Sequence, residues 1–163
     1  MALGPENVLK GRMAETIVSE MLREAGYFVY RFGYEGILQS LIQEGLPRMK
    51  EDDMEADKIR TMPDFIVMDK DGDVSFVEVK FRSTENLGEE TKDIIRKPAK
   101  YWPEVRMIFV RPREPHFLIS RAQDWIKKEK LYPLEKEKFL KVNGKIIKKY
   151  ENLVKKYLSA NQF

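Results

Sequence analysis

Three charged residues, Asp64, Glu78 and Lys80, lie within or directly beside two apolar runs of the sequence and could do chemistry together. Carboxylates are the ligands that a hard divalent ion such as Mg²⁺ prefers. An ammonium beside them can lie against a water or phosphate oxygen. Because a charged pair inside an apolar strand is costly to bury without compensation, these residues predict a divalent-metal site.

Residues 63–82 are predicted to form a β-hairpin that brings these side chains together. Two apolar runs, 65–68 and 74–81, flank a turn signal of Asp and Gly at 69–72. Alternate residues of a strand share a face, so the Glu and the Lys of the second strand point the same way. Asp64 opens the first strand and reaches that face if the register is right. The alternative is a partly exposed hairpin with an ordinary cross-strand salt bridge.

A helix is predicted over residues 8–25, with Asn7 as its N-cap and a glycine as its stop. Glu15 lies at the border of its apolar stripe, in line with residues that face the core. Two roles stay open for this residue. It could face the metal site, or it could be a helix-edge charge paired with Lys10 or Arg12.

Further strands are predicted at 27–32, 105–110 and 117–120, and a helix at 88–100 that Pro98 should end or kink. The order of elements predicts an α/β domain with a mixed central sheet. We divide the chain into a core domain, residues 1–120, and a basic helical extension, residues 121–163, packed on that core.

Residues 33–62 form a long excursion between the first two strands. A short amphipathic helix is predicted near residues 37–42, followed by an acidic run at 51–57. Long excursions in compact domains are usually functional or mobile. This one could be a lid, a dimer contact, a site for a protein partner or a solvated loop. Its acidic run should repel DNA and lie away from a DNA-binding face.

Composition excludes several classes of site. Without Cys there is no disulfide, thiolate metal site or Cys nucleophile, and the single His116 cannot supply a zincin, a zinc deaminase or a two-histidine nuclease. We expect His116 to be structural. No apolar run is long enough for a membrane span, so a cytoplasmic, intracellular protein with no membrane partner is expected.

The extension 121–163 carries twelve Lys or Arg residues against five Asp or Glu residues, whereas the net charge of the whole chain is +3. Such asymmetry predicts a polyanion partner. Its last helix could use its apolar stripe as core or as a dimer contact. Its lysines could be only a solvated face, and a membrane-surface role ranks third. The apolar stripe consists of Ile146, Ile147, Tyr150, Leu153, Val154, Tyr157 and Leu158.

The pattern Pro63-Asp64 followed by Glu78-Val79-Lys80 resembles the PD-(D/E)XK nuclease superfamily. The order of elements over residues 8–120 is similar to its restriction-endonuclease-like αβββαβ core. The phrase KGRMAETIVSEMLREAGYFVYR looks like the start of archaeal-type Holliday junction resolvases, although the excursion departs from that pattern.

The resemblance implies a role for each matched residue. Asp64 and Glu78 would bind Mg²⁺, for which Mn²⁺ can substitute, the main-chain carbonyl of Val79 would join them, and Glu15 would be a further ligand. Lys80 would orient the attacking water or stabilise the charged transition state. The three carboxylates, the Val79 carbonyl and Lys80 together form the predicted catalytic and metal site.

The function that follows is a metal-dependent endonuclease that hydrolyses DNA, with branched DNA as the leading substrate. One alternative is a catalytically silent module of the same fold that binds DNA or a protein. Another is a partner protein that uses the stripe of the last helix. Dimerisation would suit a two-strand cutter. The candidate DNA contacts, each with an ordinary surface or capping role as its alternative, are Arg31, Arg82, Ser83, Lys92, Lys97 and Lys100.

Overall fold

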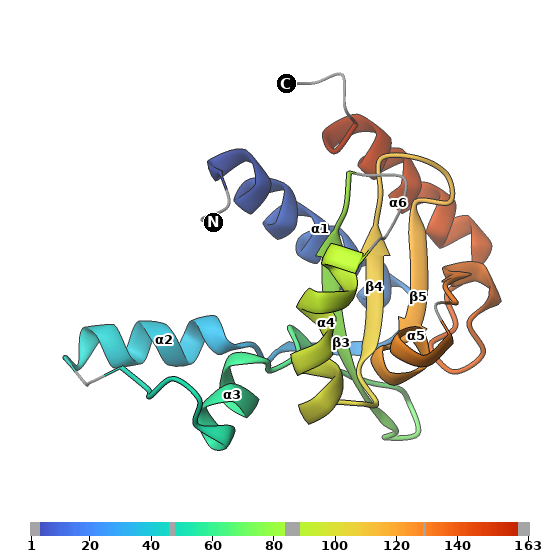
Figure 1. Cartoon of the computed structure of the whole chain (residues 1–163). Coiled ribbons are helices and arrows are strands. Elements are labelled where there is room, and N and C mark those ends of the chain that lie inside the picture. Colours follow the sequence, from blue (N-terminus) through green and yellow to red (C-terminus); the bar gives the residue numbers. More distant parts are fainter. Residues whose placement is uncertain (1–3, 46–47, 84–88, 129, 160–163) are drawn as a thin grey trace.

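A six-stranded sheet is the centre of the computed structural model, which describes residues 4–45, 48–83, 89–128 and 130–159 (Figure 1). The strands lie side by side in chain order, and among them β3 and β4 are parallel while the other neighbouring pairs are antiparallel. The predicted mixed sheet is therefore confirmed. The strands are β1 (Phe28–Arg31), β2 (Phe65–Met68), β3 (Val74–Phe81), β4 (Arg106–Val110), β5 (Phe117–Arg121) and β6 (Tyr132–Pro133).

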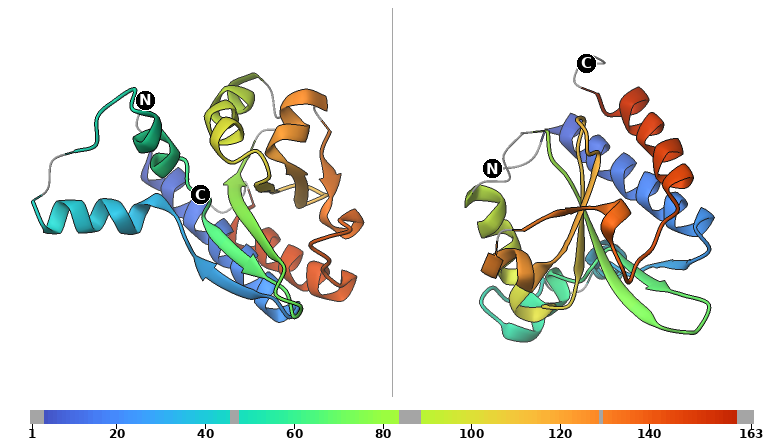
Figure 2. Two further views of the ribbon diagram at one scale, coloured as in Figure 1. Left: turned by 90° about the horizontal axis from the view of Figure 1, so that it is seen from below. Right: turned by 90° about the vertical axis from the view of Figure 1, so that its right-hand side faces the viewer.

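Helices cover both faces of the sheet. On one face lie α1 (Pro5–Glu24) and α6 (Gly144–Tyr157), and on the other lie α4 (Glu89–Tyr101) and α5 (Ala122–Lys128), as the views in Figure 1 and Figure 2 agree. A 3₁₀ turn, Leu134–Lys136, precedes α6. None of the helices in the described ranges has the length and apolar character that a bilayer span requires.

A hydrophobic core lies on each face of the sheet, and the side chains of β3 point alternately into one and the other. Val77 and Val79 are buried against α1 and α6, whereas Phe76 packs with the core under α4 and α5. Glu78 and Lys80 share the α4 side with Phe76, since alternate residues of a strand share a face. The predicted hairpin thus has the predicted facing.

One predicted helix boundary is wrong. Asn7 is not the N-cap of α1, because the helix begins at Pro5, whose fixed φ suits the first helical position, and Gly4 is the cap residue. Gly26 follows the helix with a φ of 99°, as expected for a glycine stop. Pro98 does not end α4, which continues to Tyr101.

The excursion contains two helices, α2 (Tyr34–Gln43) and α3 (Met54–Arg60). The predicted helix is confirmed, but part of the acidic run is ordered rather than a solvated loop. Asp53 caps α3 by accepting from the N–H of Ala56 at 2.9 Å. Asp57 is buried and pairs with Lys97 of α4 at 3.1 Å, so α3 is fastened to the body while α2 projects from it (Figure 1).

Most of the apolar stripe of the last helix belongs to the core, while Tyr157 is 42% exposed. Ile147, Tyr150 and Val154 are buried in the same cluster as α1, which excludes them as a dimer or base-stacking surface. The Tyr150 hydroxyl donates to Glu24 of α1 at 2.7 Å. The extension is also not wholly helical, since β6 extends the sheet beside β5. The domain boundary at residue 120 stays a prediction.

His116 is buried at the start of β5, where its Nδ1–H donates to the main-chain oxygen of Arg111 at 2.9 Å. This contact lies at the turn between β4 and β5, away from Asp64 and Glu78 in the sheet register. The location agrees with the structural role expected for the residue.

Candidate metal centre

The β2–β3 ladder ends at the pair Phe65–Val77, just after Pro63 in the chain, and the candidate site lies where it ends. The register pairs Phe65 with Val77, so the next hydrogen-bonded pair would be Pro63 with Val79. Proline has no N–H to donate, and the Pro63 carbonyl accepts instead from the N–H of Gly33 at 2.9 Å. Both main-chain polar groups of Val79 therefore lack their ladder partner.

The Asp64 side chain takes over part of that lost ladder. Its Oδ2 accepts from the N–H of Val79 at 2.8 Å, and in return its own N–H donates to Glu78 Oε2 at 3.1 Å. The main chain of Asp64 stays with β1, since its carbonyl accepts from the N–H of Phe32 at 2.8 Å. This reciprocal pair of hydrogen bonds fixes two carboxylates side by side at the split, the place where β2 and β3 separate.

The main-chain carbonyl of Val79 faces the same gap. In a strand the N–H and C=O of one residue point to the same side, and the Val79 N–H points to Asp64. A carbonyl oxygen is a hard donor like the two carboxylates. The Val79 carbonyl therefore points toward the same gap as the Asp64 side chain. That Asp64, Glu78 and Val79 bind one ion together stays a prediction.

Lys80 lies one strand repeat beyond Glu78 and pairs with it, Nζ to Oε1, at 2.5 Å. Both side chains are largely covered, with exposed fractions of 27% for the lysine and 13% for the glutamate. Burial alone would lower the pKa of the Lys80 ammonium, but the charges of Glu78 and Asp64 outweigh burial and raise that pKa. Lys80 is thus held as a cation at neutral pH.

Asp64 has the most perturbed carboxyl of the site. Burial, followed by the negative charge of Glu78, raises its pKa from 3.8 to about 8, against the opposing bond from Val79 N–H. Glu15 adds to the rise, which places this carboxylate within electrostatic range. A divalent ion would relieve this repulsion, so the donor set and its charge both fit a bound cation.

Glu15 faces the site from α1 and pairs with an arginine that was not expected as its partner. Arg31 Nη1 lies 3.2 Å from Glu15 Oε2, and the same guanidinium lies over the Phe65 ring at 5.4 Å. Pairing of Glu15 with Lys10 or Arg12 stays a prediction. Within the part of the chain that the structure describes, no three Asp, Glu, His or Cys side chains gather closely enough to hold a metal ion. A metal role for Glu15 stays a prediction.

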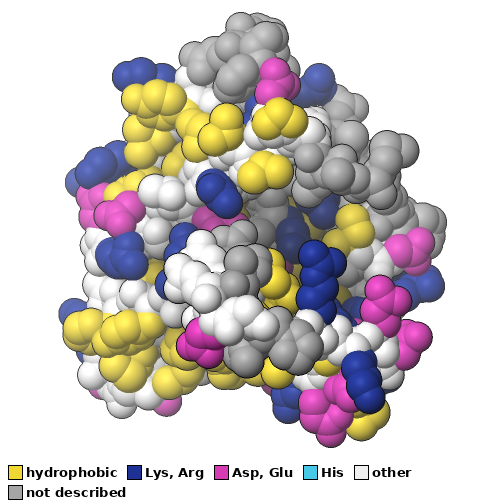
Figure 3. Space-filling view, turned by 90° about the vertical axis from the view of Figure 1, so that its left-hand side faces the viewer, with side chains coloured by type: hydrophobic (Ala, Val, Ile, Leu, Met, Phe, Trp, Pro, Cys, Tyr) yellow, Lys and Arg dark blue, Asp and Glu magenta, His cyan; other side chains and the backbone are white. Residues whose placement is uncertain are grey.

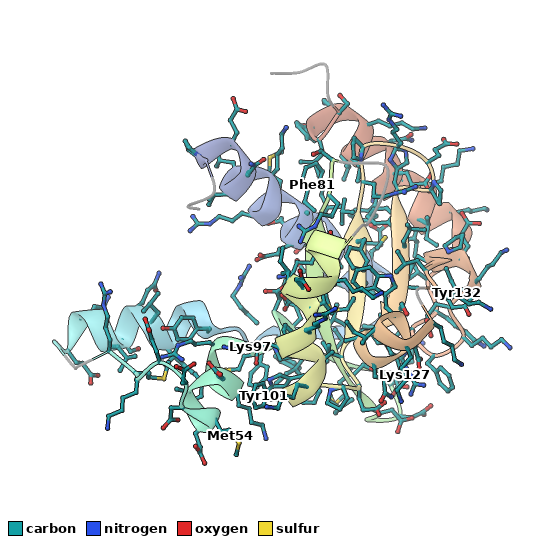
Figure 4. All side chains as sticks on the ribbon, in the orientation of Figure 1. Met54, Phe81, Lys97, Tyr101, Lys127 and Tyr132 are labelled. Carbon is teal, nitrogen blue, oxygen red and sulfur yellow. The ribbon has the colours of Figure 1, made fainter. Side chains whose placement is uncertain are left out.

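The candidate DNA contacts lie in different surroundings. Arg82 and the exposed Ser83 follow Lys80 directly, at the end of β3. Lys97 points from α4 to α3, where it pairs with Asp57 (Figure 4), and Lys100 lies over the ring of Tyr101 at 5.2 Å. Lys92 is half-buried on α4. Arg31 contacts Glu15 at 3.2 Å, and a DNA role for any of the six stays a prediction.

An aromatic cluster beside the site was not expected from the sequence. Phe32, Phe76 and Trp102 form an aromatic cluster with ring centroids 5.3–5.8 Å apart, next to the carboxylates on the same face of the sheet. The alternation of Phe28, Tyr30 and Phe32 could have signalled it. Figure 3 shows the face from which α2 projects, with acidic and basic side chains inside its hollowed centre.

Comparison with known proteins adds no relative: no family model, no curated protein and no solved structure matches the chain. The function must therefore be argued from the geometry of the site.

Proposed function

We propose that the chain is a metal-dependent endonuclease that hydrolyses phosphodiester bonds of DNA. The observation that carries the proposal is the pair of carboxylates, Asp64 and Glu78, fixed by reciprocal hydrogen bonds at the split between β2 and β3, with Lys80 beside them. A site built for stability alone would not place two carboxylates together in a largely buried position, since each raises the cost of ionising the other.

A divalent ion held by Asp64, Glu78 and the carbonyl of Val79 would lower the pKa of a bound water and offset charge on the phosphoryl oxygens. The residues of the chain supply the rest. Asp64 and Glu78 hold each other in place through main-chain N–H groups, so little reorganisation accompanies binding. Lys80, kept cationic, would stabilise negative charge that develops on the reacting phosphate. Mn²⁺ should replace Mg²⁺, because it accepts the same oxygen donors.

The proposed activity is tested by cleavage of a supercoiled plasmid and of a four-way DNA junction in Mg²⁺, Mn²⁺ or EDTA. We expect cutting in either metal, none in EDTA, and none by Glu78→Ala under any condition. Glu55→Ala is the matched control, because Glu55 is an exposed carboxylate on α3 outside the site. Cutting by Glu78→Ala at the wild-type rate would contradict the assignment, and preference for the junction would support action on branched DNA.

One observation favours a second function, a catalytically silent module that binds DNA or a protein. Glu78 is paired with Lys80, and Glu15 is paired with Arg31, so both glutamates already have a cationic partner. A divalent ion would have to compete with these pairs. Tight DNA binding without cutting in any metal would favour this module over the nuclease.

A further inference from the structure

Half of the α4-side face of the sheet is uncovered and apolar. In both views of Figure 2 the β2–β3 hairpin extends past α4 and α5, which pack on β4 and β5. Phe28 and Tyr30 of β1 are 52% and 53% exposed there, and Val74 of β3 is 55% exposed. Large aromatic side chains this open on a sheet face indicate a binding surface.

The strand register joins this surface to the candidate metal centre. The β1–β2 and β2–β3 pairings place side chains of the same face in rows across three strands. The third row is fixed by the bond from Phe32 N–H to the Asp64 carbonyl. The rows, from the turn of the hairpin inward, are Phe28–Met68–Val74, then Tyr30–Ile66–Phe76, then Phe32–Asp64–Glu78.

Phe28 and Tyr30 are spaced for successive bases of an unpaired strand. Alternate residues of a strand lie about 7 Å apart, a separation that an extended single strand can match with one base on each ring. Phe32 ends the exposed series, because Phe76 and Trp102 pack against its ring. The row of Phe32, which follows that of Tyr30, is the one that carries Asp64 and Glu78.

Charge limits the surface at both ends. At the inner end the exposed Lys58 lies over Trp102, with its Nζ 5.6 Å from the ring centroid, where it can meet a phosphate. At the outer end the turn carries Asp69, Asp71 and Asp73, which would repel a longer strand. The surface therefore suits about two or three nucleotides.

A second copy of the chain is a poorer occupant. Extension of the sheet by β1 of another molecule needs the outward carbonyl of Val29, but Arg23 Nη2 already donates to it at 3.2 Å. The continuity of the aromatic rows with Asp64 and Glu78 has no use in a dimer contact. An unpaired nucleic-acid strand accounts for both the ring spacing and that continuity.

We propose that Phe28 and Tyr30 stack bases of an unpaired DNA strand next to the scissile phosphate. The preferred substrate would then be duplex DNA that carries a single-stranded tail or arm. This inference rests on the proposed nuclease function and names its substrate class.

The test compares binding of a blunt duplex and the same duplex with a four-nucleotide tail, by fluorescence anisotropy in EDTA, where no cutting is expected. The double variant Phe28→Ala/Tyr30→Ala should lose about ten-fold or more in affinity for the tailed DNA and less than about two-fold for the blunt DNA. Tyr132→Ala is the matched control, because Tyr132 is a 48% exposed aromatic on β6, the opposite edge strand, and it should change neither affinity.

A second readout separates stacking from a folding defect. A 2-aminopurine base in the tail should be quenched by wild type, and Tyr30→Leu, which keeps an apolar side chain without an aromatic face, should lose quenching while its melting temperature stays close to wild type. Unchanged affinity for tailed DNA in the double variant, or an equal loss for both DNAs, would overturn the inference. So would light scattering that shows a wild-type dimer split by these substitutions.

The tail-binding assay and the plasmid-cleavage assay together distinguish this inference from the proposed function. If wild type cuts plasmid with Mg²⁺ but shows no preference for the tail, the stacking surface is wrong and the nuclease stands. If it binds tails through Phe28 and Tyr30 yet cuts no DNA with any metal, the nuclease is wrong and the stacking surface stands.

Discussion

Replacement of Lys80 by alanine is expected to lower the rate of DNA cleavage by about 10³-fold and to leave DNA affinity nearly unchanged. Lys80 is the cation nearest the carboxylates on β3, where it pairs with Glu78 at 2.5 Å. Its ammonium would act on charge that develops only as the phosphodiester bond breaks, so its loss should reduce the rate of the chemical step rather than ground-state binding.

Single-turnover cleavage in Mg²⁺, with affinity measured separately in EDTA, checks this expectation. Lys80→Arg should recover part of the rate, because it keeps the charge while altering its reach. Lys50→Ala is the matched control, since Lys50 is an exposed lysine of the excursion that is neither beside Glu78 nor among the candidate DNA contacts. Wild-type cutting by Lys80→Ala would remove this residue from the catalytic machinery.

Asp64→Asn is expected to make the metal-free protein more stable at alkaline pH while abolishing cleavage. Asn keeps a side-chain oxygen that can accept the N–H of Val79, but it removes a carboxylate placed beside Glu78. The folded-state pKa of Asp64, about 8, lies above its ordinary value of 3.8. The folded state therefore binds this proton more tightly, and the stability it contributes is complete below about pH 4 and lost as the pH rises through about 8.

The difference in stability between the variant and wild type should thus grow from near zero at pH 4–5 to about 2–5 kcal/mol at pH 8–9 in EDTA. Denaturant unfolding at both pH values checks this. Titrating groups that do not interact with Asp64 cancel, because they are common to the two proteins. A variant less stable than wild type at pH 8.5 in EDTA would show that the Asp64 charge is not a burden on the fold.

Added Mg²⁺ gives a second arm to the same experiment. A cation at the site should stabilise wild type and so reduce its deficit, because a ligand that binds only the folded state raises the free energy of unfolding. The Asn variant, which lacks a ligand carboxylate, should respond much less. An equal response of both proteins would place the bound ion elsewhere.

The convergence of Asp64, Glu78 and Lys80 was predictable because it follows from strand periodicity and one tight turn. Once residues 74–81 form a strand, Glu78 and Lys80 must share a face, and the turn at 69–72 fixes the register that brings Asp64 opposite. Burial of the last helix through its apolar stripe follows from the same kind of local pattern.

The way the site is held together could not be predicted, because it depends on three strands at once. The role of Pro63 at the end of the ladder depends on the N–H of Gly33, which donates to the Pro63 carbonyl. Arg31, which pairs with Glu15, comes from β1. In contrast, α3 had a local signal that sequence reasoning missed. Asp53 stands three residues before Ala56, whose N–H it accepts, as an N-cap does.

The central claim is that a divalent ion binds where β2 and β3 separate, and anomalous scattering from a crystal grown with Mn²⁺ tests it most directly. We predict an anomalous peak within about 2.0–2.4 Å of a carboxylate oxygen of Asp64, a carboxylate oxygen of Glu78 and the carbonyl oxygen of Val79. The peak should vanish in Glu78→Ala. Peaks found only elsewhere on the protein, with the Glu78–Lys80 pair intact, would contradict the assignment of this site as a metal centre.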